Sequence, residues 1–160
     1  MLRPDDDGRW PDLAGRIVKD EAGRRHVLPV RVYFEDTDFS GLVYHASYLR
    51  WCERGRSDFL RLIGSEHHAL IEGAGAREAA AFVVRRMSLE YLKPARIDEV
   101  LEVVTRVKQV TAATLVLDQR IIRDRAELFT AEVMVVLVSQ TGKPQRLSAV
   151  LRDALVCERD

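Results

Sequence analysis

The stretch "YLRWCERGRSDFLRLIG" at residues 48–64 decides the fold, because its apolar residues recur with the period of a helix. They fall at steps of three and four, and charged residues fill most of the positions between them. The spacing predicts a helix of about 18 residues that ends at Gly64. Gly55 in its middle costs about 1 kcal/mol relative to Ala. Either that cost is simply tolerated, or a sheet approaches the helix closely at Gly55, which we favour. The apolar stripe comprises Tyr48, Trp51, Cys52, Gly55, Phe59, Leu62 and Ile63.

Strand patterns dominate the rest of the chain. Residues 15–36 contain two β-type runs around the turn signal Ala22-Gly23, which favours a hairpin. From Phe82 onward, alternating apolar residues predict four more strands with short turns between them. Connections this short imply mostly antiparallel neighbours. The four predicted strands are residues 81–92, 100–110, 113–124 and 128–140.

The order of these elements is a strand, a long helix and a meander of four strands, which predicts an α+β domain. We expect residues 1–26 to be an N-terminal arm with the hairpin, its first 14 residues mobile, and residues 27–160 to be the main domain. Residues 65–79 are expected to form a short helix and a glycine-containing loop. The tail at residues 148–157 is expected to be a short helix.

Length and charge exclude several classes of protein. The 160 residues suit one domain, and 25 basic residues balance 25 acidic ones, which argues against a dedicated nucleic-acid binder. Cys52 and Cys157 have neither metal-type spacing nor the pattern of a disulfide framework. We expect no signal peptide and no membrane span, since the longest apolar run, at residues 133–138, is short. A cytoplasmic protein is the prediction.

Three carboxylates, Glu35, Asp36 and Asp38, stand within four residues between a predicted strand and the predicted helix. Such a cluster indicates a metal site, a solvated turn or a catalytic base. A calcium loop that starts at Asp36 would need a glutamate at its twelfth position, which is Ser47, and a helix before it. A zinc site made of Asp36, Asp38 and His45 lacks a further well-spaced ligand. We therefore expect no metal.

Other chemical motifs are weak. Cys52 lies among the apolar helix positions, where a packed thiol is far commoner than a nucleophile. What remains is a carboxylate that faces the first turn of a helix, whose free amides can stabilise an oxyanion. Such a pair is sufficient to attack an activated carbonyl. The alternative is that Asp36 and Asp38 only cap turns and that His45 merely starts the helix.

Two segments carry a resemblance to a known family. They are "VRVYFEDTDFSGLVYHASYLRWCERGRSDFL" at residues 30–60 and "FVVRRMSLEYLKPARIDEVLEV" at residues 82–103. They resemble the hotdog-fold 4-hydroxybenzoyl-CoA thioesterase superfamily and, within it, the YbgC-like acyl-CoA thioesterases associated with the Tol–Pal cell-envelope system. The resemblance covers about residues 28–145.

The resemblance implies a hotdog fold, in which a mainly antiparallel sheet of five strands wraps one long helix. It implies hydrolysis of an acyl-CoA without a cofactor, with Asp38 as the nucleophile or the general base. The backbone amide at His45 would polarise the thioester carbonyl, and Gly41, Tyr44 and Tyr48 of the same motif would bind the substrate. Homodimers, commonly paired into homotetramers, with active sites at subunit interfaces, are implied as well.

One departure from the family concerns the CoA nucleotide. The turn at residues 110–113, where relatives often carry basic residues, reads Val-Thr-Ala-Ala. Arg85, Arg86 and Lys108 are then the candidates for phosphate contacts, and ordinary solvation is the alternative for each of them. The choice between CoA and acyl-carrier protein stays open. A hotdog hydratase or dehydratase, or a non-catalytic acyl-thioester-binding or envelope-interaction module, are the rival functions, and neither would release a free thiol.

Overall fold

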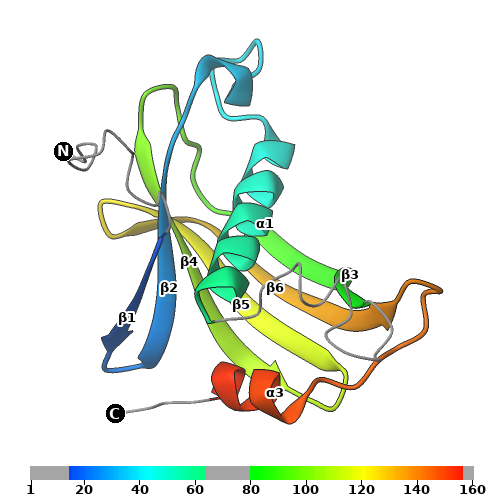
Figure 1. Ribbon diagram of the computed structural model, residues 1–160. Helices are drawn as coiled ribbons and strands as arrows, with labels where there is room; N and C mark the ends of the chain where they lie inside the picture. Colours follow the sequence, from blue (N-terminus) through cyan, green and yellow to red (C-terminus); the bar gives the residue numbers. More distant parts are fainter. Residues whose placement is uncertain (1–14, 64–79, 157–160) are drawn as a thin grey trace, which may run out of the picture.

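A long helix, α1 (His45–Leu62), lies across one face of an antiparallel sheet of six strands in the computed structural model (Figure 1), which describes residues 15–63 and 80–156. A short 3-10 turn, η1 (Phe34–Asp36), precedes α1, and a short helix, α3 (Ala149–Val156), ends the described chain. This is the α+β architecture that the sequence predicted. The strands are β1 (Arg16–Asp20), β2 (Gly23–Arg31), β3 (Ala80–Tyr91), β4 (Val100–Val110), β5 (Thr114–Arg123) and β6 (Ala126–Ser139).

The apolar stripe of α1 packs against the sheet nearly as its period predicted. Trp51, Cys52 and Phe59 are buried and belong to the main hydrophobic core. The last turn of the helix departs from the prediction, because Leu60, outside the predicted stripe, is buried, whereas Leu62, within it, is exposed. The helix ends at Leu62, and the predicted terminal glycine at position 64 lies outside the described residues.

The predicted N-terminal hairpin is confirmed, and it extends the sheet. β1 pairs with β2 from Arg16↔Val27 to Asp20↔Gly23. β2 continues beyond the hairpin and pairs with β4 through residues 26–31. The sheet therefore has six strands, which are the five that the resemblance implied and one more from the hairpin. Residue 26, where the N-terminal arm was expected to end, lies within β2.

The predicted meander of four strands is wrong, because β3 does not lie beside β4. The strand order is β1-β2-β4-β5-β6-β3, and β3 pairs with β6 at the far edge (Figure 1). Only β4, β5 and β6 form a meander. The connection from β3 to β4 at residues 92–99 crosses the ends of β6 and β5, where Leu92 donates a hydrogen bond to the carbonyl of Leu128 (2.8 Å) and Arg123 to that of Pro94 (3.3 Å).

The length of that connection allows the crossing. Three strand spacings amount to about 14 Å, and eight residues can span up to about 26 Å. A short connection therefore implies that two strands run antiparallel, as β3 and β4 do. It does not imply that the two strands are neighbours in the sheet.

The close approach of the sheet at Gly55 is confirmed. A Cβ atom at Gly55 would lie 2.9 Å from Val103 Cγ1 and 3.3 Å from Thr105 Oγ1, both on β4. Beside it, Gln119 on β5 donates hydrogen bonds from Nε2 to the Cys52 carbonyl oxygen and to Thr105 Oγ1, each 2.9 Å long. Only a residue without a side chain lets the helix backbone approach the sheet at this point.

Other predictions have mixed outcomes. The predicted C-terminal helix is confirmed as α3. The N-terminal arm at residues 1–14, the helix and loop at residues 65–79 and Cys157 lie outside the described residues. In the part of the chain that is described, no helix has the length and apolarity to cross a membrane.

We expect Gly55→Val to lower the free energy of unfolding by about 1–3 kcal/mol, because the added side chain collides with Val103 in a packed core. Urea denaturation measures the change. Arg54→Val, an exposed neighbour on the same helix, is the control for the helix propensity of valine and should change stability by less than about 1 kcal/mol. Equal effects of the two substitutions would contradict the close packing.

Candidate active site

A tight turn carries Asp38. Thr37 and Val43 form an isolated antiparallel bridge, and within it the amide of Asp38 donates to the Leu42 carbonyl (3.0 Å). The amide of Gly41 donates to the Asp38 carbonyl (3.0 Å), and Gly41 has a φ of 79°, in the left-handed region that favours glycine. The role of Gly41 that the structure supports is thus to close this turn, while substrate binding at Gly41 stays a prediction.

The Asp38 carboxylate is exposed and held from one side. Its Oδ1 accepts hydrogen bonds from the Ser40 amide (2.8 Å) and the Ser40 hydroxyl (2.5 Å). The Ser40 hydroxyl, then the Ser40 amide and the nearby His45 lower the pKa of Asp38 against the opposing effect of desolvation. Asp38 is therefore ionised at neutral pH. Its Oδ2 accepts no hydrogen bond from the described residues.

Asp36 has a different environment from Asp38. Its Oδ2 accepts a hydrogen bond from the Tyr33 amide (2.8 Å), and its backbone carbonyl accepts one from the Tyr44 amide (2.7 Å). Asp36 thus joins the 3-10 turn to the start of α1. These contacts give it a structural role, as the turn-capping alternative expected.

α1 begins at His45 without a side-chain cap. Tyr44 is the N-cap residue, and its side chain makes no capping hydrogen bond. The Ser47 amide donates to the Tyr44 carbonyl (2.9 Å), whereas the amides of His45 and Ala46 have no acceptor among the described residues. Free amides at the positive end of a helix dipole are suited to bind an oxyanion.

Aromatic side chains fix this end of α1 to the sheet. Tyr91 on β3 donates a hydrogen bond from its hydroxyl to the His45 carbonyl (2.8 Å). Tyr48 is buried, stacks on Phe129 with a centroid distance of 5.5 Å, and accepts a hydrogen bond from the Ala95 amide (3.0 Å). Tyr48 was predicted to bind substrate. The structure places the Tyr48 side chain in the hydrophobic core, and its contact with substrate stays a prediction.

Tyr91 and Ser40 are the site residues that the sequence prediction missed. Tyr91 stands on the inner face of a predicted strand, and a phenol there needs a polar partner. Ser40 is two residues after Asp38, the spacing at which an aspartate commonly accepts hydrogen bonds in a turn. Both signals were present in the matched segments.

The predicted phosphate contacts lie elsewhere in the subunit. Arg85 falls at a bulge of β3, between Val84 and Arg86, and both arginines are exposed. Arg86 is five residues before Tyr91, or about 17 Å along the strand. Lys108 on β4 forms an ion pair with Glu132. Within one chain the structure does not bring these residues to Asp38, and their contact with CoA stays a prediction.

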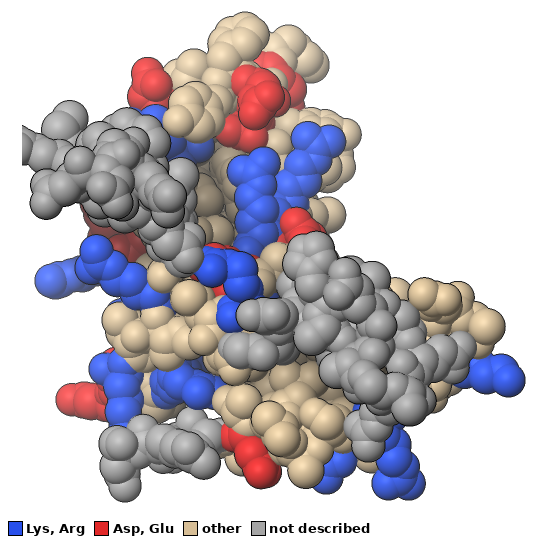
Figure 2. All heavy atoms as spheres, viewed as in Figure 1, with Lys and Arg blue, Asp and Glu red and all other residues tan. Residues whose placement is uncertain are grey.

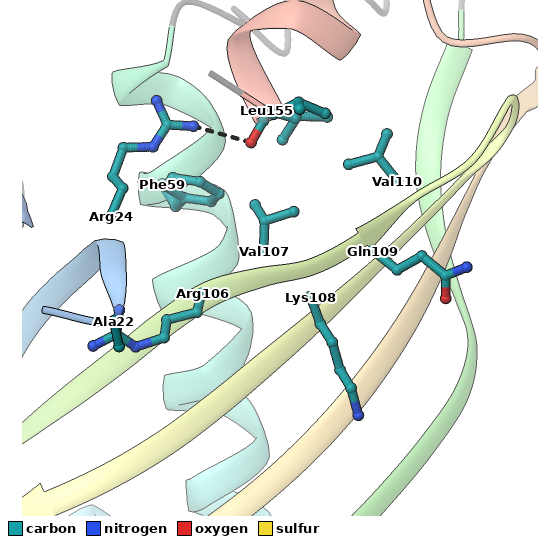
Figure 3. A pocket seen from close by; sticks show the side chains of 10 residues that line it. Ala22, Arg24, Phe59, Arg106, Val107, Lys108, Gln109, Val110 and Leu155 are labelled. Carbon is teal, nitrogen blue, oxygen red and sulfur yellow. Dashed lines mark hydrogen bonds between the residues drawn. The ribbon is translucent and has the colours of Figure 1, made fainter. Parts of the chain in front are cut away.

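A cavity of about 390 Å³ lies near the opposite end of α1 (Figure 3). Arg24 donates hydrogen bonds to the carbonyls of Ala154 (2.6 Å) and Leu155 (3.1 Å), which secures the end of α3. Figure 3 shows Val107 pointing toward Phe59, whereas Lys108 points to the other side of β4. Arg24 is thus engaged with the backbone of α3, and we assign this cavity no part in the candidate site.

The charge distribution sets the Asp38 turn apart. Acidic side chains gather at the end of the molecule where α1 begins, and Lys and Arg side chains lie farther along the helix (Figure 2). In the ranges 15–63 and 80–156, no group of three or more His, Cys, Asp and Glu side chains is arranged to hold a metal ion. The chemistry that these residues offer is a free carboxylate beside free helix amides.

The comparisons with known proteins identify the family of this chain. The family model of the thioesterase-like superfamily matches residues 32–155. The chain belongs to this superfamily. It is 47% identical over 121 residues to the acyl-CoA thioester hydrolase YbgC of Escherichia coli O6:H1, covering 74% of this chain and 87% of that protein. It is 41% identical over 111 residues to the acyl-CoA thioesterase YbgC of Haemophilus influenzae, covering 69% of this chain and 79% of that protein.

A solved structure is similar as well. The crystal structure of a probable thioesterase from Bartonella henselae has a TM-score of 0.71 and 42% sequence identity, covering 78% of this chain and 99% of that chain. The resemblance to the YbgC-like thioesterases is confirmed, and so is the hotdog fold. The chain is therefore a thioesterase.

We expect Ser40→Ala to raise the pKa of Asp38 toward its ordinary value, because the strongest hydrogen bond that stabilises the carboxylate is removed. The Ser40 amide remains, so the shift should be partial. The carbon chemical shift of the Asp38 carboxyl group, followed by NMR against pH, measures it. Ser57→Ala is the control, since Ser57 donates to Glu53 (2.7 Å). An unchanged Asp38 titration in Ser40→Ala would contradict the assignment.

Proposed function

We propose that the enzyme hydrolyses the thioester of an acyl-CoA to the free acid and CoA. The observation that carries the proposal is the ionised, exposed Asp38 carboxylate in the turn before α1, whose first amides have no acceptor among the described residues. The names of the YbgC relatives support an acyl-CoA substrate. Acyl-carrier protein is the alternative carrier of the acyl group.

Asp38 acts in one of two ways. As a nucleophile, its free Oδ2 adds to the carbonyl carbon, CoA leaves as the thiolate, and water then cleaves the mixed anhydride. As a general base, Asp38 takes a proton from a water molecule while the water oxygen adds to the carbonyl carbon. CoA again leaves as the thiolate, and the free acid forms without a covalent intermediate. In both routes the His45 amide holds the oxyanion. A thiolate is a good leaving group, so neither route needs a strong general acid.

We propose that the enzyme is a homodimer and that its active site lies at the subunit interface, as the family resemblance implies. β3 is one of the two outer strands of the sheet, the other being β1, and among the described residues only one of its edges is paired. Val83 and Val84 on β3 are exposed. A long strand edge with exposed valines favours pairing with another chain. Pairing of dimers into a homotetramer, a cytoplasmic location and an association with the Tol–Pal system rest on the family resemblance and the composition.

Asp38→Asn should reduce thiol release from acyl-CoA by at least about 10²-fold, because the amide is neither a base nor a nucleophile of comparable strength. The assay measures free CoA with a thiol reagent over a series of acyl chain lengths. Asp36→Asn is the matched control and should stay within a few-fold of wild type. Near wild-type turnover in Asp38→Asn would exclude Asp38 from the chemistry.

The same assay on His45→Ala separates the imidazole from the amide. Loss of an oxyanion donor costs about 10²–10³ in kcat, and alanine at position 45 keeps the amide. If His45→Ala lowers kcat by less than about tenfold, the backbone amide alone stabilises the oxyanion and the imidazole has no role. A larger decrease would show that the imidazole takes part.

The dimer proposal predicts that Val83→Lys with Val84→Lys lowers the mass in sedimentation equilibrium to that of one chain. Two charges on the strand edge oppose its pairing. Val150→Lys is the control, since Val150 on α3 is 80% exposed. A monomeric wild-type enzyme with full activity would refute the dimer.

A further inference from the structure

Arg56 is a buried cation that the reaction does not use. It lies on α1, and only 9% of the residue is exposed. Its Nη1 donates a hydrogen bond to Gln119 Oε1 (2.9 Å). The rest of the guanidinium makes no hydrogen bond, and no carboxylate lies within ion-pair distance of it, in the described ranges of the chain. The remaining donors are not sealed off from water, because the buried unpartnered side-chain atoms of the described residues belong to Arg25 and His26. An apolar group that displaced this water would leave the donors unpaired, which is costly.

The orientation of Gln119 explains why Arg56 has this one partner. Gln119 Nε2 donates to the Cys52 carbonyl and to Thr105 Oγ1, so its Oε1 turns toward Arg56. This network joins α1, β4 and β5 next to Gly55. The guanidinium is thus held in place by the fold, and its remaining donors are preorganised.

A cavity of about 140 Å³ lies beside Arg56. Its volume corresponds to a few water molecules or the end of an acyl chain. At its rim, Ser57 donates to Glu53 Oε1 (2.7 Å), so that carboxylate oxygen is engaged by a hydroxyl. The other lining residues are apolar, and they are Leu60, Phe82, Val84, Leu117 and Val135.

A strip of apolar residues on β3 leads from the candidate active site to this cavity. Tyr91 bonds to the carbonyl of His45 at one end of the strip, and Phe82 and Val84 line the cavity at the other. On α1, Arg56 follows His45 by 11 residues, or about 16 Å of helix. Bonds of about 1.5 Å in an extended zigzag chain advance about 1.3 Å each, so a chain of 12 carbons with a terminal oxygen spans about 15 Å, close to this distance. The strip consists of Tyr91, Leu89, Met87, Val84 and Phe82, which pair with Phe129, Ala131, Val133, Val135 and Leu137 of β6.

We infer that the cavity beside Arg56 receives the far end of the acyl chain, and that Arg56 selects chains that carry a hydrogen-bond-accepting oxygen there. The inference rests on the proposed function, because the thioester must lie at His45. A terminal methyl group would leave the guanidinium donors unpaired, whereas a hydroxyl or a carboxylate would pair them. Sites that hydrogen-bond a substrate group discriminate strongly against analogues that lack it. A carboxylate forms the stronger bond with Arg.

The test compares three thioesters of one chain length: dodecanoyl-CoA, its ω-hydroxy derivative and the mono-CoA thioester of dodecanedioic acid. Thiol release gives kcat/KM for each with the full chain. Wild type should prefer the oxygen-bearing thioesters by at least about tenfold, which corresponds to 1.4 kcal/mol. Arg56→Met should abolish this preference. Arg54→Met, a matched substitution at an exposed position of α1, should keep it.

A purely structural Arg56 gives a different result. The preference is the ratio of kcat/KM for an oxygen-bearing thioester to kcat/KM for dodecanoyl-CoA, measured on the same enzyme preparation. If Arg56→Met only reduces the fraction of folded enzyme, both values fall equally and the ratio does not change. Arg56→Lys keeps the charge and should retain part of the preference, which covers the case in which Arg56→Met fails to fold. No preference in wild type, or an undiminished preference in Arg56→Met, would overturn the inference.

Binding separates this inference from the proposed function. Calorimetry on the Asp38→Asn variant gives Kd values for the three thioesters without turnover, and the oxygen-bearing ones should bind about tenfold more tightly. If wild type releases no thiol from any acyl-CoA, the proposed function fails, and the Kd values alone decide on Arg56. If thiol is released but the three thioesters bind and react alike, only the inference fails.

Discussion

The contact between α1 and β4 at Gly55 is the constraint on which the rest of the structure depends. Two backbones approach there because position 55 has no side chain, and Gln119 joins both elements by hydrogen bonds to Cys52 and Thr105. This contact fixes where the helix lies along the sheet. A shift of one residue along α1 would place a side chain against Val103, which a packed core resists.

The position of the active end of α1 follows from that contact. Ten residues before Gly55, His45 begins the helix, and its carbonyl accepts the Tyr91 hydroxyl. Tyr48, one turn later, is held by the Ala95 amide. The Tyr91 hydroxyl on β3 and the Ala95 amide therefore hold the first turn of α1, so that its free amides face a fixed direction. Preorganised donors of this kind are effective because they need no rearrangement during the reaction.

The sequence predicted what depends on local periodicity and on a contiguous motif. The helix, the hairpin and the strand positions belong to this group. The position of β3 beside β6 was not predictable, because it depends on a connection that crosses the ends of two strands. The bond between Tyr91 and His45 and the bond between Arg56 and Gln119 join residues 46 and 63 positions apart, and no local pattern encodes them. Leu62, which the helical period placed on the apolar stripe, is exposed, so the period failed in the last turn of this helix.

Covering by a partner subunit would have two opposing effects on Asp38. Removal of water strengthens the electrostatic interaction between an oxyanion and the amides of α1. The same removal raises the pKa of a carboxylate, because burial penalises the charged form. The two hydrogen bonds from Ser40 oppose that rise, and they occupy only Oδ1. In such a covered site the turn from Asp38 to Gly41 would keep the carboxylate ionised and would leave its second oxygen without a hydrogen bond from Ser40.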